Sequence, residues 1–305
     1  MSDLITVTNL TKRYGDFTAV DGISFSVHRG ETFGILGPNG AGKTTTLEMI
    51  EGLKSITAGE VVLDGLSVKN RPRDVKHRIG VQLQASSFFD GLNLKELVET
   101  FASLYGRKVD AMQLLRQVQL EDKWKSRVKE LSGGQKQRLS IAVALVNDPL
   151  AVFLDEPTTG LDPQARRNLW DLIENIKAKG KTVILTTHYM EEAEVLCDRV
   201  AIMDHAHIIA LGTPQELLKQ SDVGSTIEFR ANRRPPTEII QQLPAVQQMD
   251  AEDHGFKLLT IDPEKTLPAL FAVEAQHGFK IFDLQLRQAT LEDVFLKLTG
   301  RKLRE

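Results

Sequence analysis

The feature that most constrains the fold is a glycine-rich segment between a predicted strand and a predicted helix. Residues Gly37–Thr44 read GPNGAGKT and fit the pattern G-x-x-x-x-G-K-[ST]. A short apolar run, Thr32–Leu36, precedes the segment, and an apolar-periodic helix over Lys43–Glu51 follows it, as this pattern requires. Glycines let backbone N–H groups turn inward around phosphate oxygens, and a helix N-terminus adds partial positive charge. The segment therefore predicts a phosphate-binding loop in an α/β protein.

Two side chains of this loop have roles that follow from their chemistry. Lys43 is expected to reach the β- and γ-phosphates of a bound nucleotide, and the Thr44 hydroxyl is expected to ligate Mg²⁺. An ordinary glycine-rich turn would match the pattern by chance about 0.01 times per chain of this size, so we reject that explanation. The other residues expected to bind nucleotide in this loop are Gly37, Pro38, Asn39, Gly40, Ala41, Gly42 and Thr45.

Two adjacent carboxylates follow a second apolar run. Asp155 comes directly after Leu150–Leu154, and the C-terminal end of such a central strand lies near a phosphate loop, where Asp155 would hold Mg²⁺ directly or through water. Glu156 is next in the chain and can orient and deprotonate an attacking water. Either residue alone could simply cap the segment that begins at Pro157. Together with the loop, the pair indicates a P-loop nucleoside triphosphatase.

A second segment with the character of an anion site narrows this class. Ser132, Gly133, Gly134 and Gln135 precede an apolar-periodic helix, and two glycines just after a Ser N-cap weaken a helix. Their presence is explained if this helix N-terminus lies flat against a phosphate. Because Gly37–Thr45 already serves that purpose within the chain, the second terminus is predicted to serve the nucleotide of another subunit.

Composition limits the remaining classes. The 305 residues include 38 Lys and Arg and 41 Asp and Glu, a formal charge of −3, with 41% hydrophobic and 26% charged residues. These values exclude collagen-like chains and disfavour disorder, and the near-neutral balance gives no sequence-wide attraction to nucleic acid or to an anionic bilayer.

No uncharged apolar run approaches the roughly 18 to 20 residues that span a bilayer. The N-terminus lacks a signal-peptide pattern, and the single cysteine, Cys197, can form no internal disulfide. We therefore expect a cytosolic chain of two domains.

A composition change near residues 221–225 predicts the domain boundary. Residues 1–222 carry all of the motifs above, with a helical subdomain inserted over about residues 85–135. Residues 223–305 are expected to form a second, smaller domain. Its predicted order is strand, helix, strand, strand, helix and strand, with a closing helix over Thr290–Thr299, which suits a ferredoxin-like α+β unit.

With these motifs in this order, the sequence resembles the ATP-binding subunit of an ABC transporter over roughly Leu4–Leu218. Four further residues match motifs of that family, and the resemblance implies a role for each of them. Tyr14 corresponds to the aromatic that stacks on adenine, and Gln84 to the Q-loop glutamine that contacts Mg²⁺ and water. Asp162 lies in the D-loop sequence Gly160-Leu161-Asp162. His188 corresponds to the switch histidine, which can stabilise charge that develops on the transferred phosphoryl group.

The resemblance also implies a fold, cofactors and partners. It implies an α/β P-loop ABC-ATPase core with a mixed sheet and an inserted helical subdomain, followed by the small α+β domain. ATP and Mg²⁺ would bind between two chains, this one and a second copy or a close relative, paired head to tail. A separate transmembrane permease would hold the chain on the cytoplasmic face of the cell membrane and dock beside Gln84, where Phe88 and Phe89 are candidate contacts. The tail, which ends in Ala289–Phe295, resembles the ABC-2-type export branch.

Three other classes compete with this interpretation. The runner-up is a soluble ABC-type ATPase of translation or DNA repair, although such proteins usually carry two ATPase modules or a long coiled coil. A regulatory module with degenerate catalysis is disfavoured because Lys43, Glu156 and His188 are all intact. A P-loop GTPase or kinase has no use for Leu131–Gln135, and the guanine motif Asn-Lys-x-Asp is absent. The sequence leaves the transported cargo and the choice between homodimer and heterodimer open.

Overall fold

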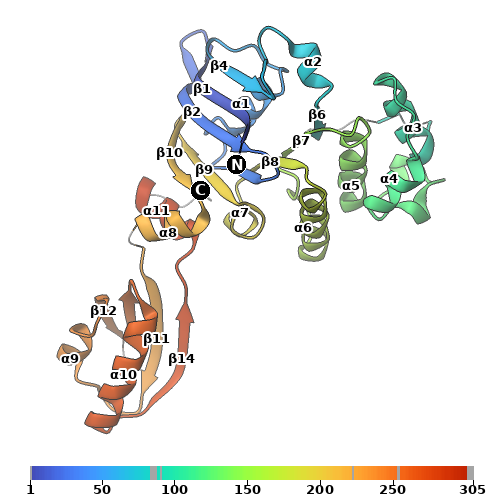
Figure 1. Cartoon of the computed structure of the whole chain (residues 1–305). Coiled ribbons are helices and arrows are strands. Elements are labelled where there is room, and N and C mark those ends of the chain that lie inside the picture. Colours follow the sequence, from blue (N-terminus) through green and yellow to red (C-terminus); the bar gives the residue numbers. More distant parts are fainter. Residues whose placement is uncertain (1, 83–87, 90, 222, 253–254, 301–305) are drawn as a thin grey trace. The chain divides into compact units, whose positions relative to one another are not determined.

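The computed structural model describes residues 2–82, 88–89, 91–221, 223–252 and 255–300 (Figure 1). The chain divides into two compact units, one up to Pro214 and the other from Gln215 onward. This division falls at the start of α8 (Pro214–Gln220), whereas the sequence placed the boundary after residue 222. The helix α8 therefore groups with the second unit, although the composition changes only after it.

A six-stranded sheet forms the centre of the first unit. Its order is β10-β9-β3-β8-β7-β6, and all neighbouring strands are parallel except β9 and β10. Every residue of β3, β7 and β8 is buried, as expected for short apolar strands that are covered on both faces. Because these three strands are adjacent and parallel, the segments that follow them emerge at one edge of the sheet. The six strands are β3 (Thr32–Leu36), β6 (Ile79–Gln82), β7 (Ala151–Asp155), β8 (Thr182–Thr187), β9 (Arg199–Asp204) and β10 (His207–Gly212).

An antiparallel sheet of order β2-β1-β4-β5 shares the hydrophobic core of the first unit. Its strands are β1 (Asp3–Tyr14), β2 (Phe17–His28), β4 (Ala58–Leu63) and β5 (Leu66–Ser67). The ring of Phe25 in β2 stacks on Phe33 in β3 with centroids 5.2 Å apart, which joins the two sheets. Strands β1 and β2 each run for 12 residues. Register shifts along the pair allow this length, because bulges let a long ribbon bend over the core.

Helices cover the central sheet. These are α1 (Lys43–Ile50), α2 (Pro72–Lys76), α6 (Pro163–Ala178) and α7 (Met190–Leu196). The 16-residue α6 buries Leu169, Leu172, Ile173 and Ile176, a spacing that places one apolar stripe against the core. Across the described ranges, the structure contains no helix with the length and hydrophobicity needed to cross a bilayer.

The helical part of the first unit gathers beside β6 and β7 (Figure 1). It consists of α3 (Leu94–Leu104), α4 (Ala111–Gln117), two short 3₁₀ turns (Glu121–Lys123 and Val128–Glu130) and α5 (Gly133–Ala144). Asn93 caps α3, and Glu96 returns a hydrogen bond to the Asn93 backbone, the capping box that this spacing predicts. The helices thus extend beyond the predicted range of 85–135, because α5 continues to Ala144 and packs on β6.

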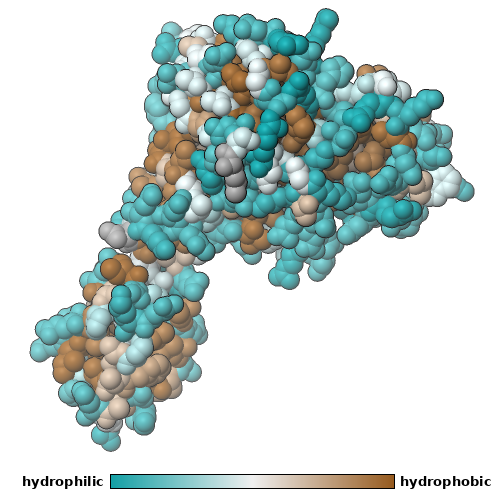
Figure 2. Space-filling model, in the orientation of Figure 1, coloured by the Kyte–Doolittle hydropathy of each residue, from teal (hydrophilic) through white to brown (hydrophobic). Residues whose placement is uncertain are grey.

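The second unit has a four-stranded sheet of order β12-β13-β11-β14, and all neighbouring strands are antiparallel. The elements are β11 (Ser225–Ala231), α9 (Thr237–Gln241), β12 (Val246–Glu252), β13 (Gly255–Thr260), α10 (Pro263–His277), β14 (Ile281–Arg287) and α11 (Leu291–Thr299). This order and pairing are those of a ferredoxin-like split β-α-β unit. Its core includes Phe229, Leu258 and Leu270. Figure 2 shows further hydrophobic residues scattered over one face of this unit, and exposed Phe271 and Phe282 belong to its surface.

Candidate functional site

The phosphate loop connects β3 to α1, and its backbone geometry requires glycine at two positions. Gly42 has φ 105°, in the left-handed region, and a Cβ at this position would lie 2.5 Å from the Ala19 carbonyl oxygen. A Cβ on Gly37 would lie 2.3 Å from the Met203 carbonyl oxygen. Among the described residues no side chain caps the N-terminus of α1, so its first backbone N–H groups remain available to an anion. The loop therefore has the construction of a phosphate cradle.

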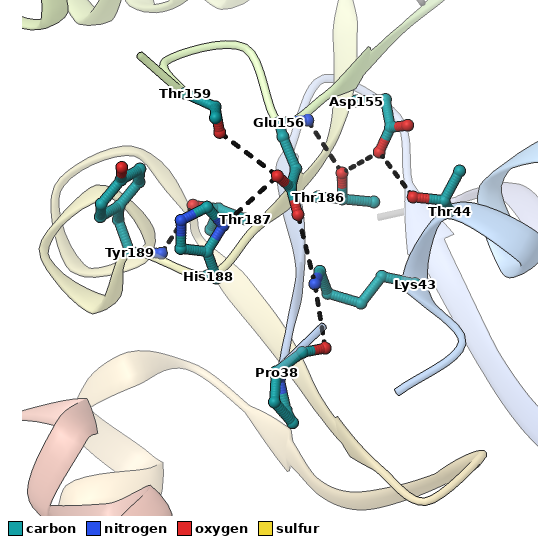
Figure 3. Close-up of polar contacts among 10 residues, drawn as sticks. All are labelled: Pro38, Lys43, Thr44, Asp155, Glu156, Thr159, Thr186, Thr187, His188 and Tyr189. Carbon is teal, nitrogen blue, oxygen red and sulfur yellow. Dashed lines mark hydrogen bonds and ion pairs between the residues drawn. The ribbon is translucent and has the colours of Figure 1, made fainter. Parts of the chain in front are cut away.

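Asp155 lies at the end of β7 and is joined to the helix that follows the phosphate loop (Figure 3). The Thr44 hydroxyl donates a hydrogen bond of 3.1 Å to Asp155 Oδ1, and the Thr186 hydroxyl donates one of 2.5 Å to the same oxygen. Burial raises the pKa of Asp155, although both hydroxyls oppose that shift. A threonine hydroxyl beside a carboxylate is a hard-oxygen pair that fits Mg²⁺, which takes few protein ligands and completes its shell with phosphates and water.

Glu156 occupies the middle of the site. Its Oε1 lies 3.3 Å from Lys43 Nζ and its Oε2 lies 3.4 Å from His188 Nδ1 (Figure 3). The hydroxyl of Thr159 donates to Oε2 at 3.2 Å. Side chains of Glu156 and Lys43 are only 9% and 5% exposed, so the pair is shielded from water. The carboxylate thus faces a cation from the phosphate loop and an imidazole from the segment after β8.

The backbone of Glu156 is held in an unusual conformation. Its φ is 46°, in the left-handed region that non-glycine residues seldom adopt. The Glu156 N–H donates to the hydroxyl and the carbonyl oxygen of Thr186, at 3.0 and 3.2 Å. Strain of this kind persists where the surroundings enforce it, and it concentrates at functional sites. Here the turn directs the Glu156 side chain toward Lys43 while Asp155 points toward Thr44.

Charge and burial compete at the two paired groups. Burial lowers the pKa of the Lys43 ammonium, and the charge and hydrogen bond of Glu156 oppose that shift without cancelling it. Burial by itself would raise the pKa of Glu156, but the neighbouring Lys43 and His188 outweigh it, so this pKa lies below its usual value. Glu156 is therefore ionised at neutral pH, which a carboxylate must be to accept a proton.

The second predicted anion site lies at the start of α5. Ser132 is the N-cap: its hydroxyl accepts from the Gln135 N–H at 3.3 Å, and Gln135 Oε1 accepts from the Ser132 N–H at 3.0 Å. Ser132 and Gly133 are exposed, and a Cβ on Gly133 would meet open space. Gly134 differs, because a Cβ there would lie 3.2 Å from the Cβ of Ala165 on α6. This glycine thus also allows α5 to approach α6 closely.

Two of the remaining predicted residues, Tyr14 and Asp162, lie at the ends of elements of the first unit. Tyr14 ends β1 and is 45% exposed, with Lys12 Nζ 4.8 Å from its ring centroid. Asp162 caps α6 by accepting a hydrogen bond of 2.9 Å from the Ala165 N–H. Gln84 lies outside the described residues, two positions beyond the end of β6 at Gln82.

Sequence reasoning missed two polar neighbours of the carboxylates. Thr186 bonds both Asp155 and the Glu156 backbone, and Thr159 bonds the Glu156 side chain. A usable signal was present at Thr186, because a polar residue at the end of a fully buried strand needs a buried partner. Thr159 carries no comparable signal, since it lies in an exposed turn.

Comparison with known proteins gives independent evidence about the family of this chain. Residues 20–159 match the family described as ABC transporter. The chain is 41% identical to Nod factor export ATP-binding protein I of Burkholderia orbicola, with 97% of each protein covered. It is 38% identical to the protein of that name from Ralstonia nicotianae, with 99% of this chain and 95% of the relative covered.

Solved structures give the same picture for the first unit. An ATP-binding subunit of an ABC transporter superposes with a TM-score of 0.64 at 30% identity, over 71% of this chain and 92% of its own. An ATP-binding cassette solved as a dimer in a post-hydrolysis state, with ADP and Pi, superposes with a TM-score of 0.62 at 27% identity. That match covers 68% of this chain and 98% of the cassette.

Proposed function

The chain belongs to the ABC transporter family as an ATP-binding, ATP-hydrolysing subunit, and from this premise we propose how its residues work and what they drive. The protein acts as a head-to-tail dimer that encloses two ATP molecules and powers export through a separate transmembrane permease. A soluble ATPase of translation or DNA repair is not favoured, because relatives matched along nearly their whole length carry the name of an export protein.

The observation that carries the catalytic part of the proposal is the position of Glu156 between Lys43 and His188. Lys43 pairs with Glu156 and also donates to the Pro38 carbonyl oxygen at 3.2 Å. A bound triphosphate offers Lys43 stronger acceptors, so Lys43 turns to the β- and γ-phosphates and Glu156 loses its cation. The freed carboxylate then orients a water for in-line attack and takes its proton.

The other groups at this edge bind the nucleotide or stabilise the charge that develops during hydrolysis. His188 stabilises the charge that develops on the transferred phosphoryl group, and Tyr14 stacks on the adenine. The residues that would hold Mg²⁺ are Thr44, Asp155 and Gln84, and this ion would neutralise charge on the β- and γ-phosphate oxygens. The backbone N–H groups of Gly37–Thr45 hold the phosphates in place.

The second half of each site comes from another chain. Ser132–Gln135 and Asp162 of one chain would face the nucleotide held by the phosphate loop of its partner. Support comes from the exposed α5 N-terminus, which has room at Gly133 for an approaching phosphate. ATP favours the closed dimer because only that state supplies both sets of contacts. Hydrolysis removes the bridging charge, and the dimer opens.

Export is proposed from the names of the relatives and from the tail that resembles the ABC-2-type branch. The permease would keep the chain at the cytoplasmic face of the membrane. Phe89 is 57% exposed. The ring centroids of Phe88 and Phe89 each lie 6.3 Å from the ring centroid of Phe101 on α3. This aromatic group supports a protein contact at the helical subdomain, since a large exposed aromatic commonly marks an interface.

The test of the catalytic assignment is Glu156→Gln, which keeps the shape of the side chain and removes the base. We expect ATP hydrolysis to fall by about a thousandfold, while ATP still binds and a stable dimer forms on size-exclusion chromatography. Near-normal turnover in this variant would remove Glu156 from the role of base. Co-purification of the chain with a polytopic membrane protein tests the transporter role separately.

A further inference from the structure

A buried carboxylate next to the site has no part in the proposed mechanism. Glu192 lies in the first turn of α7 and is fully buried. Burial raises the pKa of this carboxyl, and the hydroxyls of Thr187 and Thr158 together with the Trp170 indole oppose the shift. A buried acid on a short helix costs stability unless its neighbours compensate. Its retention calls for an explanation through those neighbours.

The neighbours of Glu192 come from both sides of the site. Trp170 Nε1, on α6, donates a hydrogen bond of 3.3 Å to Glu192 Oε1. The hydroxyl of Thr158 belongs to the segment that follows Glu156, and that of Thr187 to the end of β8 directly before His188. Glu192 therefore touches the two segments that carry Asp162 and His188.

A second chain of contacts runs from α6 to the imidazole. The guanidinium carbon of Arg166 lies 4.3 Å from the ring centroid of Tyr189. The Tyr189 ring in turn lies against His188 with centroids 4.2 Å apart, as Figure 3 shows for the latter pair. The positive charge of Arg166 also acts on Glu192. Arg166 lies in the first turn of α6, the helix that Asp162 caps, so a shift of this turn would reach the His188 ring through Tyr189.

Among the residues that the structure describes, three buried polar atoms in this cluster meet no hydrogen-bond partner: Glu192 Oε2, Thr158 Oγ1 and Arg166 Nε. Buried polar groups are nearly always paired, so a group of unpaired ones calls for a functional explanation. The Thr158 hydroxyl nevertheless lies close enough to Glu192 to lower the pKa of its carboxyl. The cluster thus joins α6, α7 and the segment after Glu156 through polar contacts of Glu192 with Trp170 and Thr158.

We propose that Glu192 is a positioning residue that couples the 158–162 segment to His188 and sets the orientation of the imidazole toward Glu156. The proposal rests on the proposed role of His188 in hydrolysis. When the partner chain presses on Asp162, the shift of α6 is passed through Trp170, Arg166 and Glu192 to the turn that holds His188. Glu192 acts through His188 and contacts no substrate.

The test is a double-mutant cycle in the full chain. We expect Glu192→Ala to lower kcat about tenfold, since small misplacements of catalytic groups have effects of this size, with KM for ATP changed less than about twofold. In a His188→Ala background, the same substitution should cost almost nothing, because its effect passes through the imidazole. Glu192→Gln keeps an acceptor for Trp170 and should retain most of the wild-type kcat. Glu191→Gln, exposed on the same helix, is the matched control.

A spectroscopic readout separates positioning from simple destabilisation. The chain has two tryptophans, so a Trp124→Phe background leaves Trp170 as the single reporter. Glu192→Ala should shift the Trp170 emission and abolish its response to ATP, whereas Glu192→Gln should keep that response. Trp170→Phe, which removes only the donor, should lower kcat a few-fold at unchanged KM.

Three results would overturn the proposal. They are an unchanged kcat in Glu192→Ala, an equal loss in the wild-type and His188→Ala backgrounds, and a wild-type kcat in Trp170→Phe. These failures differ from a failure of the proposed mechanism, because Glu156→Gln tests that mechanism and leaves Glu192 unchanged.

Discussion

The N-termini of α1 and α5 are both glycine-rich, yet the molecule builds them in opposite ways. At α1 no side chain caps the helix, Lys43 is buried, and glycine is required by contacts within the chain. At α5 the Ser132–Gln135 capping box satisfies the helix end, and Gly133 faces open space. We propose that the first terminus binds phosphate, and within its own chain Thr44 and Lys43 of α1 contact Asp155 and Glu156. The second is stable alone and offers its exposed side to something outside.

This difference shows how one chain can hold both halves of a shared site. A helix end that is left uncapped costs stability until an anion binds, so it suits the terminus that keeps the nucleotide. A capped terminus stays ordered in the free chain and presents a preformed surface to a partner. We therefore propose that α1 sets the ATP affinity and that α5 makes hydrolysis depend on a second chain.

Among the changes at the two helix ends, the largest effect is expected from a charge placed at the second terminus. Gly133→Glu adds a carboxylate where the partner's phosphate would lie, and the open space leaves the fold undisturbed. An acid in the first helical turn is favourable by itself, so thermal stability should be unchanged or slightly higher. We expect hydrolysis to fall at least about a hundredfold through like-charge repulsion, with ATP affinity of the monomer unchanged. Hydrolysis at the wild-type rate would remove α5 from the site.

The same small substitution at both termini should separate them further. An alanine at position 42 would have to adopt φ 105°, and its Cβ would lie too close to the Ala19 carbonyl oxygen. Gly42→Ala should therefore lower the free energy of unfolding by about 2 kcal/mol and weaken ATP binding. Gly133→Ala meets no such obstacle and should change either quantity little. Urea unfolding and binding of a fluorescent ATP analogue measure the two effects. Equal losses of stability and of ATP affinity at the two positions would contradict the proposed difference between the helix ends.

A smaller effect concerns the far end of α1. Burial, with added repulsion from Asp155 and Glu48, raises the pKa of Glu51 from 4.5 to about 8. Between these two values the unfolded chain releases a proton that the folded chain retains, so the free energy of unfolding decreases as the pH rises from about 5 to 8. Glu51→Gln removes this dependence. The difference in the free energy of unfolding between the variant and the wild type should therefore shift in favour of the variant by on the order of 2 kcal/mol between pH 5 and pH 8. Parallel pH profiles of the two proteins in urea unfolding would contradict the assignment.

Much of this site could be predicted because it depends on short patterns at strand ends. Gly37–Thr44, Asp155 and His188 follow apolar runs, and adjacent parallel strands bring the segments after them to one edge. The strained turn at Glu156 and its pair with Lys43 could not be predicted, since both depend on contacts between residues far apart in the sequence. The same is true of Gly134, whose contact with Ala165 only the packing of α5 on α6 reveals.

The second unit was predictable in element order but less so in its boundary. The predicted order of strands and helices beyond residue 225 was that of a ferredoxin-like unit, and the pairing of the strands follows the same split β-α-β pattern. The helix α8 was assigned to the first domain because its composition does not differ from that of the preceding segment. Contacts within the fold decide that assignment, and they place α8 with the second unit.

The central claim is that α1 of one chain and α5 of another form one site, and mixing two inactive variants tests it most directly. Lys43→Ala should abolish tight ATP binding, and Gly133→Glu should block the second terminus, so each variant alone should hydrolyse almost no ATP. In a 1:1 mixture about half of the dimers pair the two variants head to tail, each with one intact site, so activity should return to about a quarter of wild type. A mixture as inactive as its separate components would contradict the shared site.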